Sequence, residues 1–221
     1  MDDLSFKAAA YAQVARIGKA TSHPRRLELL DLLCQGPMTV ETLAERIGLS
    51  VGSTSQHLGH LRSARLVTAT RQGSYVRYRL ADEAVCTLVV QIRQVAEQRF
   101  AELRELVEAF RSAAVPFEML DLATLRERVA ETPVVLVDVR PRDEYDAGHW
   151  PGALSMPVEE LPARWETLPS GSLIAAYCRG PYCVLSLQAA RFLQRAGVPV
   201  VRVADGVGDW RAAGTRLVGH E

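Results

Sequence analysis

The sequence has little of several features that would restrict its class. Its 221 residues contain four cysteines, 6% aromatic residues and equal numbers of basic and acidic side chains, 26 of each. No apolar run reaches the ~18 residues that a membrane-spanning helix needs, and Asp2 and Asp3 are unlike a signal peptide. We therefore expect a cytoplasmic chain with no membrane partner, whose cysteines are reactive or buried thiols instead of structural disulfides.

Length and charge distribution indicate two domains. The chain is longer than one typical domain, and its 48% hydrophobic and 24% charged residues are those of an ordinary globular protein. Divided at Ala113, the first part carries 15 basic and 12 acidic residues, and the second carries 11 and 14. Residues 46–81 contain six arginines and no acidic residue. Such a basic stripe in a neutral chain predicts a nucleic-acid interface confined to one face.

The basic stripe contains the pattern of two helices and a hairpin. Residues 39–47 have the apolar spacing of a short helix, and Ser50 is the expected N-cap of a second helix that ends near Ser63. Two strands, 66–71 and 75–80, follow around a turn that contains glycine. The side chains of the second helix expected to face the core are Val51, Thr54, Leu58 and Leu61. Those expected on its polar face, suited to a DNA major groove, are Ser53, Gln56, His57 and His60.

Several ordered motifs extend this pattern over residues 4–113. They are LELLDLL at 27–33, LAE at 43–45, SQHL at 55–58, LV at 66–67 and YVRYRL at 75–80. With these motifs the first part resembles the ArsR family of winged-helix repressors. The resemblance implies a mainly α-helical winged helix-turn-helix domain with a two-stranded wing, which binds double-stranded operator DNA as a homodimer.

The resemblance also assigns roles to residues. It implies that the base readers are Ser53, Ser55 and Gln56, the backbone contacts His57 and Arg62, and the wing contacts Arg71, Gln72 and Arg77. Dimer contacts are implied for helices at residues 4–20 and 82–111, the latter as one helix of about 30 residues. The apolar residues available on that last helix are Val85, Leu88, Val89, Ile92, Val95, Phe100, Leu103, Leu106 and Val107.

Metal sensing, the usual role in this family, lacks its ligands here. There is no Cys-x-Cys motif in the helix-turn-helix region and no histidine in residues 82–111. We therefore expect neither a metal nor a cofactor. Relatives that respond to persulfide use one cysteine on the second helix and one on the last. Cys34 and Cys86 lie on the corresponding helices, but at different positions along them. These two residues are either regulatory thiols or buried structural thiols.

The second part contains a cysteine between a strand and a helix. Residues 173–177 are an apolar run, Cys178 to Cys183 form a six-residue loop, and residues 184–190 have a helical pattern. In such a loop the backbone N–H groups and the helix dipole stabilise a thiolate or persulfide. This arrangement predicts sulfur transfer on Cys178; the alternative is a turn with two incidental cysteines.

A second motif upstream has a strand at 134–137 followed by DVRPRDEYDAGHWPGA at 138–153. Together with the cysteine loop and residues 205–214, it makes residues 117–217 resemble the rhodanese family, which implies an α/β domain with a parallel sheet and a sulfurtransferase activity. Asp205 departs from the glycine usual in the family. Asp138 and Arg140 can pair with each other or with Glu144, and His149 is expected to pack instead of acting as a base. The residues expected to support the loop are Asp138, Arg140, Glu144 and Gly180.

The length of the loop favours sulfur over phosphate, since related dual-specificity phosphatases use a loop one residue longer. We place Cys178, Arg179 and Cys183 in the catalytic site. Arg179 is either a guanidinium that binds an anionic donor such as thiosulfate or a solvent-exposed loop arginine. Cys183 is either a second thiol that attacks a persulfide on Cys178 or a buried cysteine at the start of a helix.

Two functions are consistent with a winged-helix domain at 1–113 and a rhodanese-like domain at 114–221, joined by a short linker near 112–117. The first is a transcriptional repressor that senses reactive sulfur species, such as thiosulfate or a low-molecular-weight persulfide, through persulfidation of Cys178. The alternative is a sulfurtransferase whose winged helix dimerises it or tethers it to DNA.

Overall fold

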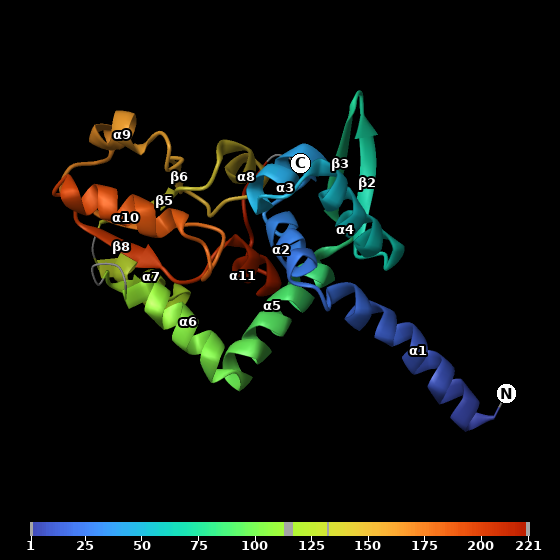
Figure 1. The fold of residues 1–221 in the computed structure, drawn as a ribbon. Helices are drawn as coiled ribbons and strands as arrows, with labels where there is room; N and C mark the ends of the chain where they lie inside the picture. The colour runs from blue at the N-terminus through green and yellow to red at the C-terminus, as the bar shows by residue number, and fades with distance from the viewer. Residues whose placement is uncertain (1, 113–116, 132, 220–221) are drawn as a thin grey trace. The chain divides into compact units, whose positions relative to one another are not determined.

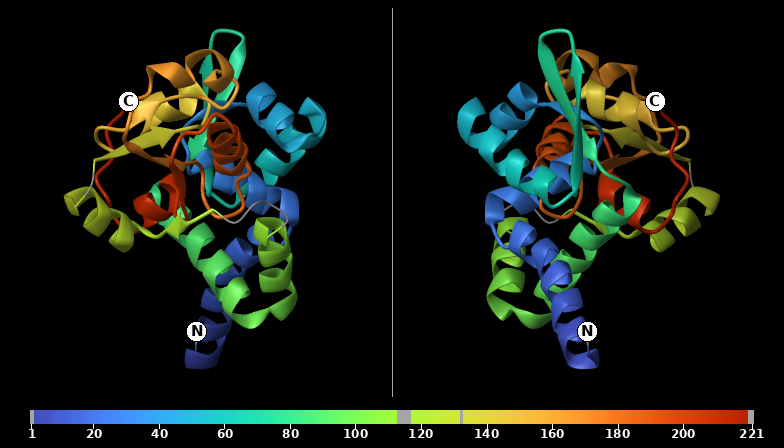
Figure 2. Two further views of the ribbon diagram at one scale, coloured as in Figure 1. Left: turned by 90° about the vertical axis from the view of Figure 1, so that its left-hand side faces the viewer. Right: turned by 90° about the vertical axis from the view of Figure 1, so that its right-hand side faces the viewer.

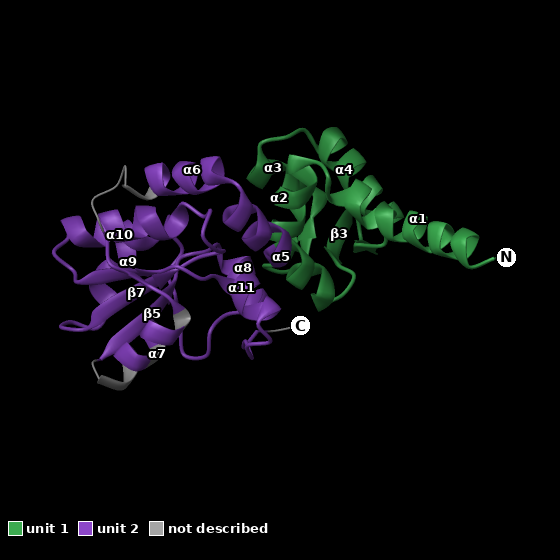
Figure 3. Ribbon diagram, turned by 90° about the horizontal axis from the view of Figure 1, so that it is seen from below, with its two compact units in different colours: residues 1–89 green, residues 90–221 purple. Residues whose placement is uncertain are grey.

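The computed structural model describes residues 2–112, 117–131 and 133–219, and the chain divides into two compact units, residues 1–89 and 90–221 (Figure 3). The predicted domain boundary at residues 113 and 114 lies outside the described residues. The division between the units falls within one helix, α5 (Glu83–Arg99). The part of α5 from Val90 onward belongs to the second unit, where Arg93 pairs with Asp209 and Glu97 accepts a hydrogen bond from Tyr182.

The first unit is a helical domain with a small antiparallel sheet of order β1-β3-β2. Strands β2 and β3 form a hairpin that extends beyond the helices of this unit (Figures 1 and 2). The elements in chain order are α1 (Asp3–Thr21), α2 (Pro24–Leu33), β1 (Met38–Thr39), α3 (Val40–Ile47), α4 (Val51–Ser63), β2 (Val67–Gln72), β3 (Tyr75–Leu80) and the start of α5. This is the predicted winged helix-turn-helix.

Local capping explains where α3 and α4 begin and end. The hydroxyl of Thr39 accepts the N–H of Thr42 at the start of α3, and Gly48 ends that helix with a φ of 66°, which favours glycine. The hydroxyl of Ser50 accepts the N–H of Ser53 at 3.2 Å, so the predicted N-cap of α4 is confirmed.

The inner face of α4 is as predicted except at one position. Thr54, Leu58 and Leu61 are fully buried, whereas Val51 is 45% exposed. The prediction for Val51 was wrong because Leu49, in the turn before α4, packs against the core at this end of the helix.

The second unit is an α/β domain around a five-stranded parallel sheet of order β4-β8-β7-β5-β6. Its elements after α5 are α6 (Ala101–Ser112), β4 (Met119–Leu120), α7 (Leu122–Glu131), β5 (Val134–Asp138), α8 (Arg142–Ala147), β6 (Leu154–Ser155), α9 (Leu161–Arg164), the short 3-10 helix η1 (Trp165–Thr167), β7 (Leu173–Tyr177), α10 (Leu185–Arg195), β8 (Val200–Val203) and α11 (Val207–Ala212). The predicted parallel sheet is confirmed.

The central strand β7 is buried on both faces. Ile174 and Ala176 belong to the core on the side of α10, and Ala175 and Tyr177 belong to the core on the side of α11. Because side chains alternate along a strand, Cys178, directly after β7, lies with the α10 side of the core. The sheet therefore delivers this cysteine to the start of α10.

The predicted single helix over residues 82–111 is wrong. The structure has two helices, α5 and α6, that meet in a bend at Phe100 (Figure 1). The guanidinium of Arg104 donates to the carbonyl oxygens of Glu97 at 2.9 Å and Gln98 at 3.2 Å. Carbonyls in the last turn of a helix lack partners within it, so this side chain stabilises the end of α5.

Candidate sulfur loop and DNA-reading helix

Residues 178–183, here called the sulfur loop, hold the thiol of Cys178 in a closed environment. Cys178 is 2% exposed. Its Sγ lies 3.3 Å from Ser186 Oγ, 3.7 Å from the carbonyl oxygen of Cys183 and 3.9 Å from that of Gly180. The loop thus curls around the sulfur atom between the end of β7 and the first turn of α10.

Hydrogen bonds around the sulfur favour the thiolate of Cys178. Burial alone raises the pKa of this thiol, but hydrogen bonds from Cys183, from the side chain and backbone of Ser186 and from the backbone of Gly180 outweigh it and lower the pKa to about 6. A thiolate is the nucleophilic form of cysteine. At neutral pH the loop therefore holds a nucleophile.

Cys183 is the protonated partner of this thiolate. Its hydrogen bond to Cys178, together with burial, raises the pKa of the Cys183 thiol. Neither cysteine forms a disulfide, and the same holds for Cys34 and Cys86. The role of Cys183 as a second, attacking thiol stays a prediction.

Arg179 pairs with a buried carboxylate and does not extend into open solvent. Its Nε is 3.1 and 3.0 Å from the two carboxylate oxygens of Glu144, and its Nη2 is 2.7 Å from Oε1. The side chain of Glu144 is fully buried and that of Arg179 is 19% exposed. Burial alone lowers the pKa of Arg179, but Glu144 raises it above its usual value. This pair ties the sulfur loop to α8.

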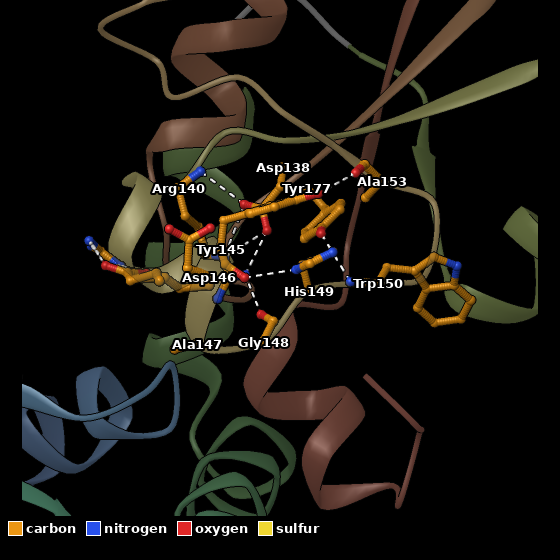
Figure 4. Close-up of polar contacts among 12 residues, drawn as sticks. Asp138, Arg140, Tyr145, Asp146, Ala147, Gly148, His149, Trp150, Ala153 and Tyr177 are labelled. Carbon is orange, nitrogen blue, oxygen red and sulfur yellow. Dashed lines mark hydrogen bonds and ion pairs between the residues drawn. The ribbon is translucent and has the colours of Figure 1, made fainter. Parts of the chain in front are cut away.

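A second buried pair supports the segment after β5 (Figure 4). Arg140 Nη2 lies 2.6 Å from Asp138 Oδ2 and donates to the carbonyl of Gly148 at 2.7 Å, with both side chains fully buried. Of the two predicted arrangements, Asp138 and Arg140 pair with each other. His149 Nδ1 lies 2.8 Å from the carbonyl oxygen of Tyr145, and the two rings stack at 3.6 Å. His149 is thus engaged in packing.

Three residues near the sulfur loop were not predicted. A Cβ at Gly206 would lie 2.2 Å from the carbonyl carbon and oxygen of Arg179, so only glycine fits there. Ser186 and Arg202 are buried polar residues that bond to each other beside Cys178. Gly206 lies in the rhodanese-like motif at 205–214, whereas no sequence signal distinguishes Ser186 and Arg202.

The predicted DNA contacts occupy α4 and the wing of the first unit. Ser55, Gln56 and Arg62 are exposed on α4, and Ser53 and His57 are half-buried. The ring of His57 lies 4.6 Å from that of His23; burial and the positive charges of its neighbours lower the pKa of His57.

In the wing, Arg71 and Gln72 are exposed, and Arg77 is half-buried. The guanidinium of Arg77 donates to the carbonyl of Pro37 at 3.1 Å. Arg77 therefore also supports the base of the wing. The DNA-contacting roles of these residues stay predictions.

Cys34 ends α2 and Cys86 lies in α5, with 1% and 0% exposure. Burial this complete agrees with the alternative of structural thiols, and a regulatory role stays a prediction. Within the described ranges, no three His, Cys, Asp or Glu side chains are grouped so that they could hold a metal ion. No helix in the described parts of the chain is long and apolar enough to cross a membrane.

The winged helix-turn-helix of the first unit is that of the ArsR class of regulators. The parallel sheet of the second unit, with a cysteine loop after its central strand, is that of a rhodanese-like domain. The family model of the bacterial regulatory protein, arsR family, matches residues 23–69, and that of the rhodanese-like domain matches residues 121–213. The chain is 42% identical over 219 residues to the HTH-type transcriptional regulator Rv0324 of Mycobacterium tuberculosis, covering 97% of this chain and 96% of that protein. The chain therefore belongs to the ArsR-family transcriptional regulators that carry a rhodanese-like domain.

Other relatives match one part. The HTH-type transcriptional regulator YgaV of Escherichia coli is 35% identical over 96 residues, which are 43% of this chain and 97% of that protein. The solution structure of the homodimeric winged helix-turn-helix DNA-binding domain of Mb0332 from Mycobacterium bovis is 40% identical, with a TM-score of 0.43, and covers 46% of this chain and 93% of that chain.

Proposed function

We propose that this transcriptional regulator is a repressor that binds operator DNA as a homodimer and senses reactive sulfur species through persulfidation of Cys178. The observation that carries the proposal is the buried Cys178 sulfur, whose pKa of about 6 makes it a thiolate at neutral pH. A regulator with a nucleophilic thiol in a second domain is suited to chemical sensing.

The sensing step is sulfur transfer to Cys178. The thiolate attacks the outer sulfur of thiosulfate, a new S–S bond forms, and the old S–S bond breaks as sulfite leaves with the electron pair. With a low-molecular-weight persulfide the leaving group is a thiolate, which takes up the proton of the donor. In both cases Cys178 ends as a persulfide and needs no other oxidant.

Contacts between the later part of α5 and the sulfur loop support a link to DNA binding. Within the second unit, Arg93 forms an ion pair with Asp209, whose second oxygen accepts the N–H of Gly206 at 2.9 Å. The hydroxyl of Tyr182 donates to Glu97 at 2.7 Å. An extra sulfur atom in the loop would disturb these contacts.

The same helix begins in the first unit, where Val85 and Val89 belong to the hydrophobic core beside the helix-turn-helix. Helix α5 therefore shares residues with both units and can carry a change from one to the other. A coupling free energy of about 1–3 kcal/mol would change operator affinity by about 5-fold to 150-fold.

On the DNA side, a symmetric dimer presents two α4 helices to two half-sites one helical turn apart, about 34 Å between centres. The winged helix-turn-helix domain of Mb0332, which is 40% identical, is homodimeric, in support of this assembly. Gln56→Ala should reduce discrimination between sites, since the exposed Gln56 amide is suited to bonding with a base edge.

The second candidate function is a sulfurtransferase whose winged helix serves for dimerisation or tethering. The thiolate of Cys178 and the adjacent Cys183 thiol favour it, because together they provide an acceptor and a proton donor for turnover.

The test is a mobility-shift titration of the promoter of the protein's own gene, at matched salt, with reduced and with persulfide-treated protein. We expect treatment to add one sulfur atom to Cys178 by mass spectrometry and to weaken binding. Cys178→Ser should bind DNA like the reduced parent and ignore the treatment. Single Ser replacements at Cys183, Cys34 and Cys86 identify any thiol that relays the signal. Equal affinity of treated and reduced parent would refute the sensor and favour the sulfurtransferase.

A further inference from the structure

A buried hydroxyl lies next to the sulfur of Cys178, and a buried guanidinium lies next to that hydroxyl. Ser186, in the first turn of α10, is 1% exposed, and its Oγ is 3.3 Å from Cys178 Sγ. Arg202, on β8, is 4% exposed. Its Nε and Nη2 lie 3.3 and 3.2 Å from the same Ser186 Oγ.

The donors and acceptors of these three side chains decide the direction of the hydrogen bonds between them. A serine hydroxyl has one proton to donate and two lone pairs that accept, whereas a guanidinium only donates. Two N–H groups of Arg202 therefore donate to Ser186 Oγ. When Cys178 is a thiolate, the sulfur has no proton to give and accepts the Ser186 hydroxyl proton across the 3.3 Å between the two atoms. This arrangement suits a thiolate at Cys178.

We propose that Ser186 is a further functional residue of the sulfur site, which holds Cys178 as a thiolate through its hydroxyl, and that Arg202 is a positioning residue that orients and polarises this hydroxyl. The proposal deepens the proposed function and rests on Cys178 as the sulfur acceptor. In the low-dielectric interior, the positive charge of Arg202 stabilises the thiolate through the hydroxyl that lies between them.

The role differs from that of the loop backbone. Backbone N–H groups of Gly180 and Ser186 also lower the pKa of Cys178, and a backbone N–H is present whatever the side chain at these positions. The hydroxyl and the guanidinium are side chains, so substitution can remove them while the backbone remains. Their contribution can therefore be measured separately.

The experiment is the pH dependence of alkylation of Cys178 by iodoacetamide in the full-length protein, read by mass spectrometry of the peptide that contains Cys178. We expect Ser186→Ala to raise the midpoint by about one pH unit, a tenfold change in the ionisation constant. Ser186→Thr, which keeps a hydroxyl, should remain close to the parent. Arg202→Met should raise the midpoint less, and should add little in the Ser186→Ala background, because Arg202 acts through the hydroxyl.

The matched control is Ser155→Ala. Ser155, on β6, has a buried hydroxyl oxygen with no hydrogen-bond partner among the described residues. Its removal should leave the midpoint unchanged. If the alkylation midpoint of Cys178 is the same in Ser186→Ala as in the parent protein, the proposal is wrong. If that variant does not fold, by circular dichroism, Arg202→Met decides alone, and an unmoved midpoint overturns the proposal.

This titration needs neither operator DNA nor a sulfur donor. If Ser186→Ala raises the alkylation midpoint of Cys178 but persulfide treatment does not change the operator affinity of the parent protein, the sensor function is refuted and this inference stands. The opposite result would leave the sensor function intact and refute this inference.

Discussion

Glu144→Gln should destabilise the second unit, because Glu144 is the fully buried partner of Arg179. Three nitrogen to oxygen distances of 2.7 to 3.1 Å join the two side chains. Removing one partner of a buried ion pair costs about 3–5 kcal/mol, since the other charge is left uncompensated. Arg179 keeps 19% exposure, so we expect about 3 kcal/mol, or a fall in melting temperature of about 10 °C.

The assay is urea unfolding followed by tryptophan fluorescence. All three tryptophans, Trp150, Trp165 and Trp210, lie in the second unit, so the signal reports that unit alone. Arg179→Met should cost a similar amount, and the double variant should cost clearly less than the sum of the two.

The control for this cycle is Asp146→Asn, which breaks the exposed pair between Asp146 and Arg142 and should change little. Additive effects of the two substitutions at Glu144 and Arg179, or a loss for Glu144→Gln as small as that of the control, would refute the reasoning.

Three further results are expected. Gly206→Ala should destabilise the protein by about 1–3 kcal/mol in calorimetry, because its Cβ would overlap the backbone of the sulfur loop, whereas Gly52→Ala on α4, with open space, should not. Alkylation of Cys178 should be half-maximal near pH 6 and flat well above it, since the thiolate reacts; a midpoint near the unfolded value of 9.0 would contradict the site geometry. Arg93→Ala should reduce the response of operator affinity to persulfide without weakening reduced-state binding; an unchanged response, as expected for Arg142→Ala, would exclude this route.

The architecture of both units could be predicted because its signals are local. The N-cap at Ser50, the glycine turn of the wing and the apolar strand before Cys178 are each set by neighbouring residues in the sequence. The parallel sheet followed from apolar runs that are buried on both faces. For the same reason the cysteine loop at the start of α10 was predicted at the correct residues.

The bend at Phe100 could not be predicted from the apolar pattern. The spacing over residues 82–111 is helical on both sides of the bend, so periodicity alone predicts one helix. The helix ends at Arg99 because the carbonyls of its last turn find the guanidinium of Arg104. A side chain that reaches back to the backbone leaves no mark in the hydrophobic period.

The sequence by itself determined which chemistry the second unit contains: a cysteine after a buried strand and before a helix, with two further motifs in order. Only the tertiary structure decided the partners of that chemistry. It placed Arg179 on Glu144, 35 positions away, and Arg202 on Ser186, 16 positions away. The choice of a buried charge's partner depends on distances across the sheet, and these distances exist only once the strands have paired and the core has closed.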